Sequence, residues 1–382
     1  MTNDSEVELS VVMPCLNEAD TISTCVEKAQ RTLAEHGIRG EVVVADNGSV
    51  DGSQALAEAL GARVVPVASK GYGNALMGGI AASRGKFVLM GDADDSYDFC
   101  ELNKFVEKLR EGYDLVQGCR LPKGGGSVMP GAMPMSHRWL GNPMFSALAR
   151  SWFGAPINDV YCGMRAFTKR HYESLNQRCT GMEFATEMII KSSLHRARIA
   201  EVPITLHPDG RKAHPPHLRT VRDGWRTLRF FLMYSPRWLF LIPGGVLFAL
   251  GLLGYALAMP AVVFQGITFD AHTLLFASVA ILCGYQSVLF AIFTKTFAER
   301  EGLTPEDPLL ARFFRYVTLE TGLAAAVLAL LAGGGLLLGA VMKWKAAGFG
   351  ALDYPRTMRW VIPGSTLTAP ATVAAGAWES TA

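Results

Sequence analysis

The stretch that decides the fold is Lys86–Ser96, with the sequence KFVLMGDADDS. Its four consecutive apolar residues, Phe87–Met90, are too few for a helix and are typical of a buried strand. Two carboxylates, Asp92 and Asp94, follow the strand directly. At positions i and i+2 beyond a strand end they can reach one divalent cation, and hard cations such as Mg²⁺ and Mn²⁺ prefer oxygen ligands. An acidic turn without any ligand is the alternative for so short a motif.

Similar strand-like runs recur on both sides of this stretch and alternate with segments of helical periodicity, of which Asp20–Glu35 is the clearest. The other predicted strands are Leu9–Met13, Glu41–Ala45, Ala62–Val67 and Asp114–Cys119. This alternation predicts an α/β domain over residues 1–210, with a mostly parallel sheet between two layers of helices. Ligands of such sheets bind beyond the carboxyl ends of the strands, so the site is expected there.

Three further polar motifs lie where the predicted strands end or the next helix begins. They are PCLNE at Pro14–Glu18, DNGSVDGS at Asp46–Ser53 and KGYGNALMGGIAAS at Lys70–Ser83. Asp46 can accept hydrogen bonds from a base or a ribose, and Asp51 can cap the helix that follows it. The glycines of the third motif would let a helix N-terminus approach phosphate groups closely. A plain strand–turn–helix connection is the alternative for each motif alone.

Composition excludes several other classes of protein. A net charge of +2 over 382 residues is too small to indicate nucleic acid as a partner. The seven cysteines are scattered without the spacing of a zinc site, which favours reduced thiols in a cytosolic domain. The first ten residues, MTNDSEVELS, are polar and show no signal peptide, so the N-terminal domain is expected to stay in the cytoplasm.

The chain beyond Tyr234 is dominated by long apolar runs. We predict a membrane domain over residues 238–382, with spans at 238–258, 271–294 and 322–342, each long enough to cross a bilayer. A fourth candidate at 360–378 contains Pro363 and Pro370, and whether it spans the membrane is left open.

A basic juxtamembrane segment, 211–237, precedes the first predicted span. It carries seven Lys or Arg residues against one acid, and residues 219–234 are expected to form an amphipathic helix on anionic lipid. The loop 265–270 contains no Lys or Arg, which predicts a multi-pass protein with a cytoplasmic catalytic domain. The basic residues after the third predicted span, from Lys343 to Arg359, disagree with this orientation.

Taken together and in this order, the motifs resemble glycosyltransferase family 2, which has the GT-A type of nucleotide-sugar-binding fold. Within the family they more closely resemble the polyprenyl-phosphate sugar synthases, over roughly residues 7–240. Three later stretches match the family as well: Gly118-Cys-Arg120, Asp159-Val-Tyr-Cys-Gly163-Met-Arg165 and Glu183-Phe-Ala-Thr-Glu187. One position departs from it, because Asn47 stands where the family has the second aspartate of a pair.

This resemblance implies a UDP- or GDP-linked sugar as donor, undecaprenyl or dolichyl phosphate as acceptor, and Mg²⁺ or Mn²⁺ held by Asp92 and Asp94. The candidate catalytic residues are Asp94, Arg120, Asp159 and Arg165. The candidate substrate-binding residues are Pro14, Asn17, Glu18, Asp46, Asn47, Asp51, Lys70, Gly71, Gly73, Asn74, Asp92, Glu187, Arg211 and Lys212.

The implied acceptor determines what the site must provide. A sugar hydroxyl would need a general base, whereas a polyprenyl phosphate is already an anionic nucleophile. It needs cations to lie beside the donor diphosphate, for which Arg120, Arg165, Arg211 and Lys212 are the candidates. For Arg211 and Lys212, a role in membrane topology is the alternative. The expected reaction is one in-line displacement that inverts the anomeric carbon.

Three other functions compete with this interpretation. A processive polysaccharide synthase of the same superfamily would use a [QR]-x-x-R-W motif, and Arg356-Thr-Met-Arg359-Trp360 matches it, although it follows the third span. A non-catalytic scaffold with a degenerate transferase fold is disfavoured by the intact Asp92 and Asp94. A transporter is disfavoured because no charged residue lies in the middle of a predicted span. Assembly into a homo-oligomer is left open.

Overall fold

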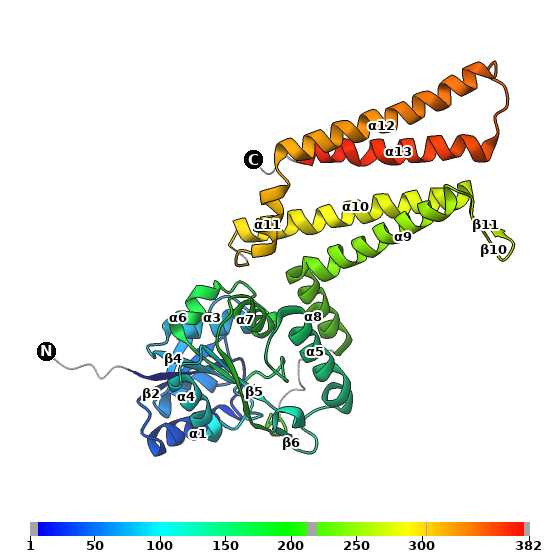
Figure 1. The fold of residues 1–382 in the computed structure, drawn as a ribbon. Coiled ribbons are helices and arrows are strands. Elements are labelled where there is room, and N and C mark those ends of the chain that lie inside the picture. The colour runs from blue at the N-terminus through cyan, green and yellow to red at the C-terminus, as the bar shows by residue number, and fades with distance from the viewer. Residues whose placement is uncertain (1–6, 212–219, 303, 378–382) are drawn as a thin grey trace. The chain divides into compact units, whose positions relative to one another are not determined.

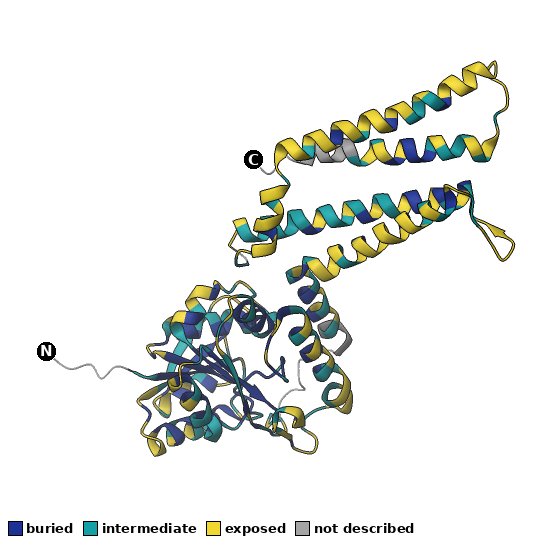
Figure 2. Ribbon diagram, viewed as in Figure 1, coloured by how far each residue is buried: buried dark blue, intermediate teal, exposed yellow. Residues whose placement is uncertain are grey.

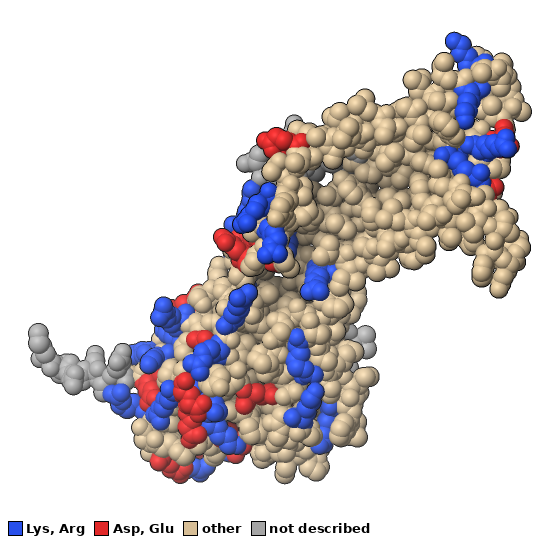
Figure 3. All heavy atoms as spheres, viewed as in Figure 1, with Lys and Arg blue, Asp and Glu red and all other residues tan. Residues whose placement is uncertain are grey.

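The computed structural model describes residues 7–211, 220–302 and 304–377, and Lys212 lies outside them. The chain forms two compact units, residues 1–234 and residues 235–382 (Figure 1). Charged side chains are scattered over the visible surface of the first unit, whereas the long helices of the second unit are almost free of them between their ends (Figure 3). This contrast follows the break in composition near Tyr234.

The first unit is built on a seven-stranded sheet in the order β3-β2-β1-β4-β7-β5-β8. Its strands are β1 (Leu9–Cys15), β2 (Gly40–Asp46), β3 (Arg63–Pro66), β4 (Phe87–Met90), β5 (Leu115–Cys119), β7 (Arg165–Thr168) and β8 (Ile199–Pro203). All neighbours are parallel except β7, which runs antiparallel to β4 and β5. The five predicted strands agree to within two residues at each end, and the predicted fold class is confirmed.

Eight helices accompany this sheet among the described residues. They are α1 (Ile22–Glu35), α2 (Ser53–Ala59), α3 (Tyr72–Ala82), α4 (Leu102–Arg110), α5 (Asn142–Phe153), α6 (Lys169–Leu175), α7 (Glu183–Leu194) and α8 (Thr220–Tyr234). A second, two-stranded sheet pairs β6 (Ser127–Val128) with β9 (Thr205–Leu206). β6 lies within the stretch 122–134, which is rich in Gly, Pro and Met.

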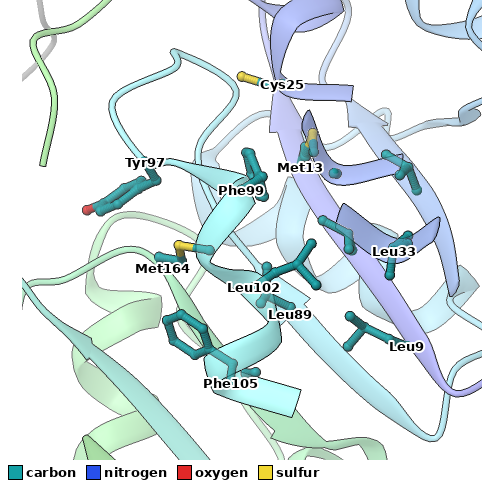
Figure 4. Packing of buried hydrophobic residues seen from close by; sticks show 14 of the residues in the cluster. Leu9, Met13, Cys25, Leu33, Leu89, Tyr97, Phe99, Leu102, Phe105 and Met164 are labelled. Carbon is teal, nitrogen blue, oxygen red and sulfur yellow. The ribbon is translucent and has the colours of Figure 1, made fainter. Parts of the chain in front are cut away.

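Buried side chains form two apolar clusters, one on each face of the large sheet. Alternation along β1 sends Leu9 and Met13 into one cluster and Val12 into the other. In the first cluster, Leu89 of β4 packs near Phe105 of α4 (Figure 4). Because both faces are covered, the strands read as continuous apolar runs in the sequence.

Helix α8 belongs to the first unit, which differs from the separate segment 211–237 predicted from the sequence. Phe231 is fully buried, and its ring meets those of Phe145 at 5.9 Å and Phe153 at 5.5 Å, both edge-to-face. Trp225, on the same helix, is 61% exposed. The helix is amphipathic as expected, but part of its apolar surface packs against its own domain.

The second unit contains three helices that are long and apolar enough to cross a membrane: Arg237–Ala258, Ala271–Arg300 and Leu319–Ala346, counted over the described residues. They correspond to the three predicted spans and comprise α9 (Ile242–Ala258) with the π-helical turn before it, α10 (Ala271–Arg300) and α12 (Leu319–Ala346). Their outer surfaces are largely exposed, as expected for helices in contact with lipid (Figure 2).

The fourth candidate segment lies in α13 (Tyr354–Ala377), which contains Pro363 and Pro370 and is not among those three helices. The remaining elements are α11 (Pro308–Tyr316) and a hairpin of β10 (Val263–Phe264) and β11 (Ile267–Thr268) that joins α9 to α10. Arg359 of α13 forms an ion pair of 3.0 Å with Asp270, the residue before α10. The start of α13 therefore lies at the hairpin end of this unit.

Glycine brings α9 and α10 into close contact. A Cβ atom added at Gly284 would lie 2.6 Å from the carbonyl oxygen of Gly244, so neither position has room for a side chain. Small residues commonly allow such backbone approach between membrane helices, where packing replaces the hydrophobic effect as the source of stability. The Tyr255 hydroxyl adds hydrogen-bond distances of 2.7 Å to Ser278 and 2.9 Å to Thr366, which link α9, α10 and α13.

We predict that Phe231→Ala destabilises the first unit by about 3–5 kcal/mol, because it leaves a cavity among packed aromatic rings. Pulse proteolysis of the full-length protein in detergent and increasing urea would measure the loss. Trp225→Ala on the same helix is the control and should change stability by about 0.5 kcal/mol or less. Equal stability of Phe231→Ala and wild type would contradict the packing of α8 on the domain.

Candidate functional site

The loops after β1, β2 and β4 meet at one edge of the sheet because these three strands are parallel neighbours. Two of the loops are joined by hydrogen bonds. Asn17 accepts one from the Val50 amide at 2.9 Å, and Asp51 accepts one from the Ala19 amide at 2.9 Å. Both side chains were predicted to bind substrate; in the structure they hold the first loop against the second. Pro14 lies before them within β1.

Asp46 is the last residue of β2 and Asn47 follows it, and the side chains of both form hydrogen bonds within the protein. Asp46 accepts hydrogen bonds from the Gly48 amide at 2.9 Å and from Gln54. Burial opposes ionisation of Asp46, but the hydrogen bonds it accepts lower its pKa overall. Asn47 donates through Nδ2 to the carbonyls of Val67 and Ser69, at 2.9 and 2.7 Å. An aspartate could not donate these two bonds, which accounts for asparagine at this position.

The turn into α3 is held by protein on both sides. The Gly71 amide donates to Oδ1 of Asn47 at 2.8 Å, and the Asn74 amide donates to the Thr180 carbonyl at 3.2 Å. A Cβ atom at Gly73 would lie 2.4 Å from the carbonyl oxygen of Cys179. The close approach expected of these glycines is therefore made here by the backbone of residues 179–181. Lys70 donates to the Asn47 carbonyl at 2.5 Å.

Asp92 and Asp94 lie just beyond β4, as predicted. Oδ1 of Asp92 accepts a hydrogen bond of 2.8 Å from the Tyr72 hydroxyl. Its Oδ2 faces Gly163, where an added Cβ atom would lie only 2.9 Å away. Burial and the neighbouring Asp94 carboxylate raise the pKa of Asp92 to about 7. Asp94 is 9% exposed, and its Oδ1 accepts from the Ser96 amide at 3.0 Å.

This pair of carboxylates fits a divalent cation. No cluster of three or more His, Cys, Asp or Glu side chains suited to a metal occurs in the described part of the chain. Mg²⁺ does not require one, since it is commonly bound by one or two carboxylates together with water and substrate phosphates. A cation would also offset the repulsion that raises the pKa of Asp92.

Arg211, which follows β9 in the chain, lies beside Asp94 and two further carboxylates. Its guanidinium forms ion pairs with Glu18 at 2.6 Å, Asp209 at 3.1 Å and Asp94 at 3.3 Å. Burial opposes its charge, but these carboxylates raise the pKa of Arg211 overall. Arg211 thus belongs to the carboxylate cluster, while Lys212 lies outside the described residues.

Arg120 and Asp159 form a buried, two-pronged ion pair. Nε of Arg120 lies 2.7 Å from one carboxylate oxygen of Asp159, and Nη2 lies 2.9 Å from the other. Arg120 is 7% exposed and Asp159 is not exposed at all. Both oxygens of the predicted catalytic carboxylate therefore accept from one arginine, and this orients Arg120. The Tyr97 hydroxyl lies 3.4 Å from Nη1 of Arg120.

Arg165 and Glu187 are fully buried. Arg165 donates to the carbonyls of Ala185 and Cys162, has no ion pair with a described carboxylate, and burial lowers its pKa. Glu187 forms an ion pair of 2.7 Å with Lys191 and accepts a hydrogen bond from the Cys179 amide at 2.8 Å. Burial opposes its ionisation, but these partners lower its pKa overall. Glu187, predicted to bind substrate, fixes the segment that contacts the α3 turn.

The sequence matches two family models. Residues 10–175 match glycosyl transferase family 2, and residues 292–375 match the glycosyltransferase family 2 C-terminal transmembrane region. A relative from Haloferax volcanii, the low-salt glycan biosynthesis hexosyltransferase Agl6, is 38% identical over 358 residues, which cover 92% of this chain and 84% of the relative. This chain belongs to glycosyltransferase family 2.

Two other relatives are similar over about half of this chain. The dolichyl-phosphate hexose transferase of Haloferax volcanii is 34% identical, covering 53% of this chain and 85% of the relative. The undecaprenyl-phosphate 4-deoxy-4-formamido-L-arabinose transferase of Klebsiella pneumoniae is 29% identical, covering 52% of this chain and 59% of the relative. The predicted family and enzyme class are confirmed, whereas the roles of the individual site residues stay predictions.

Three residues of this family 2 site were not among the predicted ones: Tyr72, Tyr97 and Gly163. Tyr72 lies in the KGYG motif, and Gly163 lies in the stretch that leads to Arg165. Both were read as parts of motifs, and nothing in the sequence indicates that they meet Asp92. Their contact with it depends on long-range packing between β4, α3 and the loop before β7.

We predict that Asp159→Asn destabilises the first unit by about 3–5 kcal/mol, because it leaves the buried Arg120 charge without its partner. The double change Arg120→Met with Asp159→Asn should be less destabilising than Asp159→Asn alone, since no unpaired charge remains. Urea unfolding followed by pulse proteolysis would compare the two proteins. Wild-type stability of Asp159→Asn would show that the ion pair does not hold this part of the fold.

Proposed function

We propose that this enzyme transfers a sugar from a UDP- or GDP-linked donor to a polyprenyl phosphate, with inversion and a divalent cation, at the cytoplasmic face of a membrane. The carrying observation is that three of the predicted carboxylates are already paired with cationic side chains of the protein. Asp159 is paired with Arg120, Glu18 with Arg211, and Glu187 is buried beside Lys191. An acceptor that needs no general base suits such a site, and a phosphate is such an acceptor.

The donor side of the proposal rests on Asp92 and Asp94. These carboxylates would hold Mg²⁺ or Mn²⁺, which supplies positive charge to the diphosphate leaving group when bound. The loops that carry Asp46 and Asn17 lie at the same edge of the sheet and are tied together, so they offer a preformed rim for the nucleotide. The names of two relatives, which contain dolichyl phosphate and undecaprenyl phosphate, support the acceptor class.

The acceptor side rests on arginines. Two phosphate charges at ~4 Å repel each other by roughly 4 kcal/mol at an effective dielectric constant near 20. Arg120 is held rigid by Asp159, which leaves one edge of its guanidinium toward Tyr97. Arg211 already lies beside Asp94 and can exchange a carboxylate for a phosphate. Arg165 is fully buried and donates to backbone carbonyls, so it would contribute positive potential without touching the substrate.

A processive polysaccharide synthase is the competing candidate, and the position of Arg359 argues against it. The ion pair of Arg359 with Asp270 holds the R-x-x-R-W string at the hairpin end of the second unit. The chain enters that unit at the opposite end of α9, one helix length away. In a polysaccharide synthase such a motif is expected before the membrane helices, whereas here it follows the third of them.

The direct test is to incubate membranes with radiolabelled nucleotide sugars and polyprenyl phosphate, and to measure label that extracts into organic solvent. We expect one donor to give labelled lipid, and we expect EDTA to stop the reaction until Mg²⁺ or Mn²⁺ is restored. Asp92→Asn and Asp94→Asn should each reduce turnover at least about 100-fold, since metal-held charge is lost from the leaving group. Glu107→Gln, a change at an exposed acidic residue of α4, serves as control. Extension of a free oligosaccharide without lipid labelling would reject the proposal.

Orientation in the membrane is tested separately. A reporter inserted after Gly266, in the hairpin between α9 and α10, should read as periplasmic or lumenal. A reporter inserted after Gly302, beyond α10, should read as cytoplasmic. Four basic residues lie around that position: Lys295, Arg300, Arg312 and Arg315. The reverse pattern would separate the site from cytosolic nucleotide sugars and contradict the proposed function.

A further inference from the structure

Asp92 is held by its surroundings in one particular orientation. Its Oδ1 accepts the hydrogen bond from Tyr72, whereas its Oδ2 lies beside the bare Cα of Gly163. A methyl group at Gly163 would lie 2.9 Å from that oxygen and 3.1 Å from the Tyr97 hydroxyl. One carboxylate oxygen is thus fixed by a hydroxyl, and space is kept next to the other.

Tyr72 is itself anchored on both sides. It is the first residue of α3, and the preceding amide, of Gly71, donates to Asn47 at the end of β2. On the other side, the Asn74 amide donates to the Thr180 carbonyl. The backbone just before Thr180 is fixed in turn by Glu187, which accepts from the Cys179 amide.

Several residues that the sequence predicted to bind substrate share one structural role, which is to fix the start of α3. Five of these residues lie at the start of α3 or hold the adjoining segment 178–181, and each contacts other protein groups there: Asn47, Gly71, Gly73, Asn74 and Glu187. Because the start of α3 is fixed, the Tyr72 hydroxyl has little freedom to move with the Asp92 carboxylate if that carboxylate rotates. The carboxylate must instead conform to the hydroxyl.

We propose that Tyr72 is a positioning residue that orients Asp92 toward the divalent cation, and that Gly163 keeps the second oxygen of Asp92 accessible. This inference rests on the proposed function, because it takes Asp92 as a ligand of the cation. A hydrogen-bonding partner behind a metal-binding carboxylate commonly contributes 10- to 100-fold to metal affinity. The tyrosine hydroxyl acts through Asp92 and need not touch substrate.

The test compares Tyr72→Phe with wild type in direct Mn²⁺ binding to the purified full-length protein with UDP or GDP present, by electron paramagnetic resonance of free Mn²⁺. We expect Tyr72→Phe to bind Mn²⁺ about tenfold more weakly. The Mn²⁺ concentration for half-maximal transfer should rise by a similar factor, while the rate at saturating Mn²⁺ recovers substantially. Tyr172→Phe, which removes a hydroxyl from α6 elsewhere in the unit, should bind Mn²⁺ as wild type does.

Gly163→Ala provides a second test that does not depend on the folding of Tyr72→Phe. Its methyl group would crowd Oδ2 of Asp92, so we expect weaker Mn²⁺ binding again. Gly224→Ala, in α8 with nothing within 4 Å of the added atom, is its control. Wild-type Mn²⁺ affinity in both Tyr72→Phe and Gly163→Ala would overturn the positioning role.

Asp92→Asn separates this inference from the function on which it rests. Loss of Mn²⁺ binding in Asp92→Asn, together with wild-type binding in Tyr72→Phe and Gly163→Ala, would reject only the positioning role. Unchanged Mn²⁺ binding in Asp92→Asn would reject the metal assignment itself, and the positioning role with it. Weakened binding in all three variants, with both controls unchanged, is the expected result.

Discussion

The parallel pairing of β1 with both β2 and β4 is the constraint on which the site depends. In this register Cys15 lies opposite Asp46, and Val12 lies opposite Met90, two residues before Asp92. The ends of three strands therefore meet at one edge, and their loops lie within hydrogen-bonding reach of one another. A shift of one residue in either pairing would turn the alternating side chains of β1 to the wrong faces of the sheet.

The site also depends on how the first unit accommodates buried charge. Two buried ion pairs fix parts of the site. Asp159 orients the guanidinium of Arg120, and Glu187, paired with Lys191, holds the segment that contacts the start of α3. A buried charge without a partner is costly, whereas a pair that is fully hydrogen-bonded can fix geometry. Arg165 differs, because backbone carbonyls are the partners that hold it among the described residues. These buried groups form a rigid base beside the candidate site.

The sequence predicted most of the sheet, and it predicted that the polar loops after β1, β2 and β4 meet at one edge. Strand-like runs of four to six residues identified β1 to β5, and the rule for parallel sheets located their polar ends. It missed β7, which has only four residues and begins with Arg165, and β8, an edge strand containing Glu201 and Pro203. Side-chain partners were beyond reach as well. Glu18 and Arg211 are 193 residues apart in the chain, and no local pattern connects them.

Sequence reasoning placed the boundary of the catalytic domain at residue 210, whereas the interactions of the first unit continue to Tyr234. The Tyr234 hydroxyl donates to Glu187 at 3.3 Å, in the last turn of α8. Glu187 is the residue that fixes the segment against α3. A protein chemist who wished to separate the enzyme from its membrane anchor would therefore need to cut after residue 234. A cut at the predicted boundary, residue 210, would also remove Arg211. Glu18 and Asp94 would then lose the guanidinium group with which both form ion pairs.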